Sequence, residues 1–162
     1  MDSAAFLPLL DVRIELRSLS GNRWVALPRF FNEDGSLNLL PGEVLTKIRI
    51  PMDEWNIKIY KKIGGYREPG GGYLSFSAIG KTQRNILGDF RFSFSFGGTT
   101  ILRNKEIEAL LNGRSIPLSE KAKLLTLNVL QNTLENMKEI DPFSGARAFR
   151  LFKWVISKLH EE

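Results

Sequence analysis

Residues 89–97, DFRFSFSFG, decide the fold class of this chain. Phenylalanine stands at every second position from Phe90 to Phe96, and side chains two apart in a strand lie on the same face. Four rings on one face predict the packing side of a sheet that helices cover. Residues 73–83, YLSFSAIGKTQ, predict the neighbouring strand, which a turn at 85–88 joins to the first.

Shorter strand patterns come before this hairpin. Residues 11–18, DVRIELRS, alternate apolar and polar side chains, which is the period of a half-buried strand. Residues 28–31 are expected to turn and to bring Phe30 and Phe31 onto the core. Further strands are predicted at 23–27, at 44–50 and at 57–63.

After the phenylalanine-rich strand the apolar period becomes that of a helix. Helices are predicted at 105–111, at 119–138 with Ser119 as its N-cap, and from Ser144 onward. Strands that come first and helices that come last favour an α+β fold over a doubly wound one. We therefore expect an antiparallel β-sheet followed by a C-terminal cluster of about three helices.

Composition narrows the possible function classes. The 162 residues are 43% hydrophobic and 25% charged, which is typical of a globular domain, and no apolar run reaches the length of a membrane span. The start of the sequence has no basic region of a secretory signal, so we expect a cytoplasmic protein. The chain has no cysteine and one histidine, His160, which argues against iron–sulfur ligation, thiol catalysis and a multi-histidine metal site in this chain.

Charge and glycine patterns do not add a catalytic motif. The net charge of +5 comes from basic residues that are interleaved with acidic ones, and we expect no nucleic-acid binding. The glycine-rich segment 64–72 joins two predicted strands, so it does not have the context of a phosphate-binding loop. From its residues alone, the chain is a soluble α+β domain with a binding or interaction role.

Five segments, taken in order, resemble one family. They match motifs of the flavin-binding subunit of the molybdenum hydroxylases, the family of xanthine dehydrogenase and carbon monoxide dehydrogenase. The segments are DSAAFLPLLDVRIELRSLSGNRWVALPRFF (2–31), LLPGEVLTKIRIP (39–51), IYKKIGGYRE (59–68), the glycine pair 97–98 and DPFSGARAFRLFKWVISKL (141–159).

The resemblance implies a partial flavoprotein subunit. Residues 1–51 would be the tail of a FAD-binding domain, and residues 52–162 the family's C-terminal domain of strands followed by helices. The N-terminal half of the FAD-binding domain, which carries the phosphate-binding loop, would be a partner. Molybdopterin and iron–sulfur clusters would lie on other partner subunits, and electrons would pass from the clusters to FAD and on to an acceptor.

The resemblance also implies four FAD-contacting residues. Asp2 matches an acid on the ribityl or adenosine side, and Val44 and Leu45 match apolar residues beside the isoalloxazine. Lys61 matches a lysine near the pyrimidine edge, where a cation stabilises reduced flavin. We do not expect the chain to be active alone. The alternative is a non-catalytic interaction or assembly domain that keeps the fold without flavin, as the glycine-rich segment 64–72 suggests.

Overall fold

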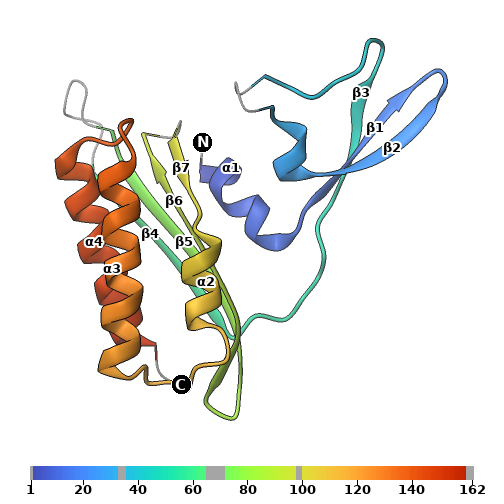
Figure 1. The fold of residues 1–162 in the computed structure, drawn as a ribbon. Coiled ribbons are helices and arrows are strands. Elements are labelled where there is room, and N and C mark those ends of the chain that lie inside the picture. The colour runs from blue at the N-terminus through green and yellow to red at the C-terminus, as the bar shows by residue number, and fades with distance from the viewer. Residues whose placement is uncertain (1, 33–35, 65–71, 98–99, 160–162) are drawn as a thin grey trace. The chain divides into compact units, whose positions relative to one another are not determined.

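The computed structural model divides the chain into two units (Figure 1). The N-terminal unit is formed by residues 6–53, and the C-terminal unit by residues 54 onward together with those up to residue 5. The predicted boundary after residue 51 and the assignment of each part to a flavoprotein domain stay predictions. The structure describes residues 2–32, 36–64, 72–97 and 100–159.

The N-terminal unit is a small antiparallel sheet with strand order β2-β1-β3. Ile14 and Leu16 of its first strand and Val12 just before that strand are fully buried, and they pack with Leu27 and Phe30. Phe30 lies on this core, as predicted, but the same prediction for Phe31 was wrong, since 45% of that residue is exposed. The backbone returns to an extended conformation at Phe31, which pairs with Leu37 and turns the ring outward. The elements are η1 (Leu7–Leu10), β1 (Arg13–Ser18), β2 (Gly21–Ala26), η2 (Leu27–Phe30) and β3 (Val44–Arg49).

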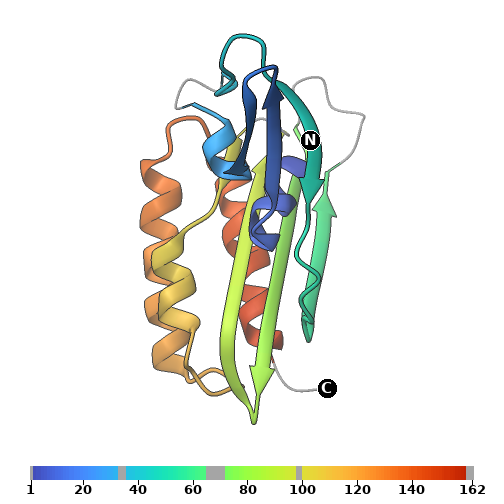
Figure 2. The ribbon, with the colours of Figure 1, turned by 90° about the vertical axis from the view of Figure 1, so that its right-hand side faces the viewer.

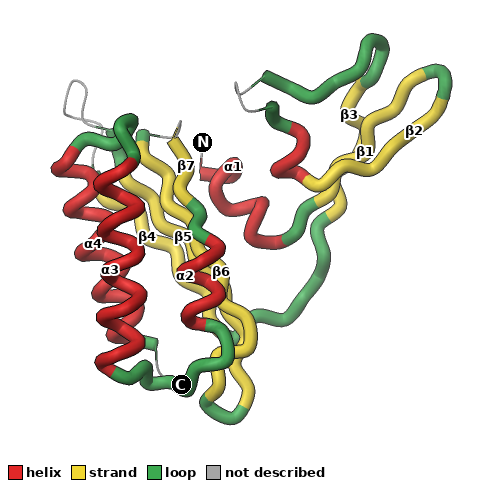
Figure 3. The backbone as a smooth tube through the Cα atoms, in the orientation of Figure 1, coloured by secondary structure: helices red, strands yellow, loops and turns green. Residues whose placement is uncertain are grey.

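The C-terminal unit is a four-stranded antiparallel sheet, in the order β4-β5-β6-β7, with helices on one face. Figure 3 shows α3 and α4 side by side on that face, and Figure 2 shows β5 and β6 as its two long neighbouring strands. No described helix is long and apolar enough to cross a membrane. The elements are β4 (Ile57–Ile63), β5 (Leu74–Gln83), β6 (Ile86–Phe96), β7 (Thr100–Leu102), α2 (Lys105–Leu111), α3 (Glu120–Asn136) and α4 (Pro142–Lys158).

The phenylalanine ladder of β6 forms the centre of the core. Phe92 and Phe94 are fully buried, and Phe152 of α4 places its ring centroid 4.8 Å from that of Phe92. Phe76 of β5 lies 4.8 Å from Phe94, again between ring centroids. The prediction of a helix-covered aromatic face is therefore confirmed.

The ends of some elements differ from their predicted positions. The Ser119 hydroxyl accepts a hydrogen bond from the Ala122 N–H at 3.3 Å, so the predicted N-cap of α3 is confirmed. The predicted start of α4 at Ser144 was wrong, because Asp141 is the N-cap and Pro142 opens the helix. Proline fits the first helical turn, where its missing N–H has no intrahelical partner. The hairpin turn lies at residues 84–85, both with positive φ, and β6 therefore starts earlier than predicted.

The short helix α1 (Asp2–Phe6) was not predicted. The Ser93 hydroxyl of β6 donates a 2.8 Å hydrogen bond to the carbonyl of Ala5. Both of these residues are buried. This contact is part of the reason that the first residues of the chain belong to the C-terminal unit.

Candidate functional site

Strand β3 presents an unpaired and exposed edge. It pairs with β1 on one side, and no described strand pairs with its other side. All six of its residues are exposed, among them Val44 at 60% and Leu45 at 43%. Exposed apolar residues continue at Ile48 and Ile50. An open strand edge that carries apolar side chains is suited to contact with a further chain segment or a ligand.

An ion pair holds the segment that leads into β3. The Arg23 guanidinium donates to both carboxylate oxygens of Glu43, at 2.7 and 2.9 Å. The Leu40 N–H donates to the same carboxylate at 2.8 Å. These donors, Arg23 first, lower the pKa of Glu43 to about 2. The carboxylate therefore stays ionised and fixes the start of the exposed strand.

A bulge in β3 is stabilised by the buried carboxylate of Glu15. The register between β1 and β3 shifts at Thr46, whose hydroxyl donates to Glu15 at 2.7 Å. Asn22 of β2 donates to the other carboxylate oxygen at 2.9 Å. These hydrogen bonds, that of Thr46 first, hold the pKa of Glu15 below its usual value. The bulge thus links all three strands and sets the direction of the β3 side chains.

The core beneath this edge is small. Five residues of the N-terminal unit form its buried cluster, and the strands next to them expose many apolar side chains. Units of fewer than roughly 60 residues bury little surface and are only marginally stable on their own. The exposed edge of β3 is therefore consistent with a unit that needs further structure to complete its core.

The predicted FAD-contacting residues lie in different elements. Val44 and Leu45 lie together on β3, whereas Lys61 lies on β4 of the C-terminal unit. The Lys61 ammonium stands over the Trp154 ring, 5.4 Å from its centroid, so it faces α4. Asp2 opens α1, but its side chain lies outside the described part of the structure. The predicted glycine-rich loop also lies outside it at residues 65–71.

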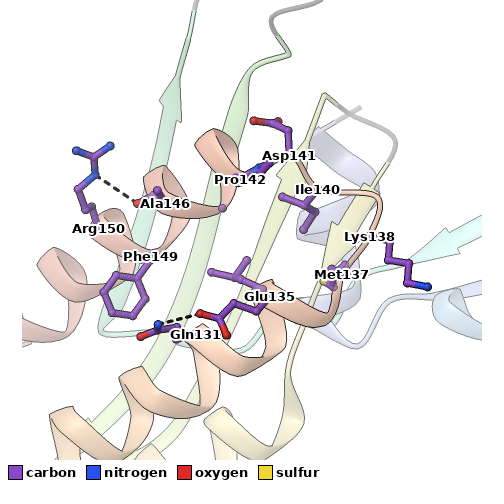
Figure 4. Close-up of a pocket in the computed structure, with 12 residues that line it drawn as sticks. Gln131, Glu135, Met137, Lys138, Ile140, Asp141, Pro142, Ala146, Phe149 and Arg150 are labelled. Carbon is purple, nitrogen blue, oxygen red and sulfur yellow. Dashed lines mark hydrogen bonds between the residues drawn. The ribbon is translucent and has the colours of Figure 1, made fainter.

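A cleft of about 1010 Å³ lies between the end of α3 and the start of α4 (Figure 4). Its apolar lining comes from Leu134, Met137, Ile140 and Phe149. The polar rim includes Gln131, whose amide donates to Glu135 at 2.9 Å. One signal in the sequence could have indicated this cleft, namely the apolar residues Met137 and Ile140 beyond the end of α3. In the described residues, no group of acidic or histidine side chains could hold a metal ion.

Comparisons with known proteins show the fold. No family model and no curated protein matches the chain. Solved structures do match, among them a cyanide-inactivated Cu,Mo-CO dehydrogenase at 17% identity and a TM-score of 0.67, over 97% of this chain and 54% of that one. A reconstituted CO dehydrogenase from Oligotropha carboxidovorans matches at 18% identity and a TM-score of 0.68, over 93% of this chain and 53% of that one.

A second enzyme has the same fold. Quinoline 2-oxidoreductase from Pseudomonas putida 86 matches at 17% identity and a TM-score of 0.62, over 96% of this chain and 53% of that one. The α+β fold that the resemblance implied is thus confirmed. This chain spans about half the length of the solved chains it matches, and over that half it has the fold found in CO dehydrogenase and quinoline 2-oxidoreductase.

Proposed function

We propose that this chain is part of the FAD-binding subunit of a molybdenum hydroxylase of the xanthine dehydrogenase type. In this role it helps to bind FAD and to pass electrons from iron–sulfur partners to the final acceptor. The observation that carries the proposal is the exposed apolar edge of β3 in a chain that has the fold of half a CO dehydrogenase chain. An N-terminal half of the FAD-binding domain would complete the small core of the N-terminal unit.

The residues of β3 fit an apolar wall of a flavin site. Val44 and Leu45 follow one another in β3, so their side chains lie on opposite faces of the strand. Both are largely exposed, and an apolar group of this size excludes water from a ring placed against it. FAD, when bound, would supply the electron-accepting ring. The bulge next to these residues keeps them in place through Glu15 and Thr46.

Lys61 fits this proposal less well than the apolar wall does. Its ammonium already has a cation–π partner in Trp154, on the helix-covered side of β4. A role at the pyrimidine edge of a flavin would require Lys61 to leave that ring. The contact of Asp2 with FAD likewise remains a proposal.

The partners follow from the chemistry that the chain lacks. The sequence has no cysteine, so the iron–sulfur clusters and the molybdopterin cofactor would be held by partner subunits. The proposed N-terminal half of the FAD-binding domain would supply the phosphate contacts. We place this complex in the cytoplasm.

A FAD titration followed by visible absorption tests the proposal. The full chain is titrated alone and together with a chain that supplies the proposed N-terminal half, and the mixture is expected to give a shifted, saturable flavin band. Val44→Asp should weaken FAD binding at least tenfold, because a buried carboxylate beside the ring is costly. Leu124→Asp is the matched control, since Leu124 of α3 is 61% exposed and Val44 is 60% exposed.

The same experiment tests the alternative function. A non-catalytic assembly domain of this fold would bind its partner chain without flavin, and the cation–π contact of Lys61 favours this candidate. A colourless mixture that still co-elutes in gel filtration would overturn the flavin proposal and support the assembly domain. If Val44→Asp and Leu124→Asp weaken FAD binding equally, β3 is not part of the FAD site.

A further inference from the structure

Strand β4 and helix α4 gather positive charge that the sequence distributes over distant segments. Seven of the chain's 23 lysine and arginine residues stand on these two elements, and none of its 18 acidic residues does. Two contacts place the elements side by side: Lys61 lies over the Trp154 ring, and Arg147 lies close to Gly64. We define the basic face as Lys61, Phe143, Arg147, Arg150, Lys153, Trp154 and Lys158.

The spacing along α4 places most of the basic face on one side of the helix. Five of its residues follow one another at intervals of three or four, which is the period of one helix side. The stripe is about 22 Å long at 1.5 Å per residue. The opposite side of α4 is buried against the sheet, so the stripe faces solvent. The five are Phe143, Arg147, Arg150, Trp154 and Lys158.

Two exposed aromatic rings stand among the cations of this face. Phe143 is 65% and Trp154 is 45% exposed. The Arg147 guanidinium lies 5.4 Å from the centroid of the Phe143 ring, and Lys61 lies at the same distance from that of Trp154. No cation of the basic face forms an ion pair with a carboxylate that the structure describes.

We propose that the basic face is a docking surface for an acidic protein, one that presents several carboxylates around an apolar patch. Tryptophan and arginine are enriched in the energetic centres of protein interfaces, with charged residues at the rim. The cations of this face would accelerate association with a surface of opposite charge and fix its orientation. This proposal goes beyond FAD binding and does not depend on it.

The geometry favours an acidic protein over nucleic acid. Single-stranded nucleic acids bind in basic grooves where bases stack on open aromatic rings. On this face, Lys61 and Arg147 already occupy a side of each ring. Most of its residues lie along the exposed side of one helix rather than in a groove, although Arg150 also lines the cleft between α3 and α4. Insertion into a membrane is also disfavoured, because the apolar side of α4, including the fully buried Phe152 and Val155, forms the core.

Fluorescence anisotropy of a labelled decaglutamate peptide tests the docking surface. The full chain should bind the peptide at low salt, and Arg150→Glu, Lys153→Glu and Lys158→Glu combined should weaken binding at least tenfold. The control combines Arg84→Glu, Lys121→Glu and Lys138→Glu, which are exposed residues outside the basic face. It changes the net charge by the same amount and should weaken binding less than threefold. Circular dichroism checks that both variants are folded.

The aromatic part of the surface is tested separately. Trp154→Ala should weaken binding of an acidic peptide that also contains leucine more than it weakens binding of decaglutamate. Equal losses in the two triple variants would mean that only net charge matters and would overturn the proposal. The proposal would also be overturned if an oligothymidine strand or phosphatidylserine vesicles bound more tightly than decaglutamate through the same three residues.

Discussion

Phe152 is the aromatic ring of α4 that packs into the phenylalanine ladder of the sheet, and its removal should have a large effect on stability. Phe152 is fully buried, and its centroid lies 4.8 Å from that of Phe92 and 6.2 Å from that of Phe76. Phe152→Ala should lower the free energy of unfolding of the C-terminal unit by about 4 kcal/mol, because it removes transfer free energy and leaves a cavity. The ring pair with Phe92 should contribute about 1 kcal/mol of coupling in a double-mutant cycle.

Urea unfolding followed by tryptophan fluorescence measures this loss. Trp24 is the tryptophan of the N-terminal unit, so a Trp24→Phe background leaves Trp55 and Trp154 to report the C-terminal unit. Phe143→Ala on the same helix is the control. It should lower the free energy of unfolding by about 0.5 kcal/mol or less, since that ring is exposed. A loss below about 1 kcal/mol for Phe152→Ala, or one equal to the control, would refute the proposed role of this ring.

Three further predictions concern a carboxylate pair, a helix cap and a close backbone approach. The pKa of Glu43 is lowered in the folded chain, so its stabilising contribution is present above pH 5 and should fade as the pH falls toward 2. An acid titration of Trp24 fluorescence should show this loss, and Glu43→Gln should reduce it to the share that comes from Glu15, whose pKa is also lowered. Asp141→Ala should lower the free energy of unfolding by about 1 kcal/mol, because the Ser144 N–H loses its acceptor. An unchanged midpoint of thermal unfolding would show that this N-cap does not stabilise α4. Gly80→Ala should lower the melting temperature, since its Cβ would stand 3.1 Å from Ile57, whereas Gly88→Ala, whose Cβ meets its first atom at 3.7 Å, should be tolerated.

The predicted site depended on both residue pattern and resemblance. Val44 and Leu45 were expected in a strand, and they do lie on β3. Their high exposure could not be predicted, because an apolar strand is buried or exposed according to what covers it. For Lys61, the alternation of β4 indicated a shared face with Ile57 and Ile59, and the structure places its ammonium against α4. Its proposed contact with flavin remains to be tested.

Local chemistry in the sequence determined most elements of the C-terminal unit. The alternation from Phe90 to Phe96 predicted a strand with a covered face, because the geometry of an extended backbone alone puts these rings on one side. Ser119 predicted a helix start, since its hydroxyl accepts a nearby N–H. The third strand pair of the sheet, formed by the short β7, was not predicted, because three residues give no recognisable period.

Only the tertiary structure decided which distant residues share a surface. In the sequence, the basic residues alternate with acidic ones, and their pattern predicted an ordinary solvated exterior. Folding brings β4 and α4 together because their apolar sides pack into one core. Lys61, on the helix-covered side of β4, then lies beside the exposed side of α4, and together they form the basic face. Core packing between segments whose centres are about 90 residues apart follows from complementary shape and burial rather than from any local signal. The sequence therefore determined the longer elements, and long-range packing determined the surfaces through which this protein can act.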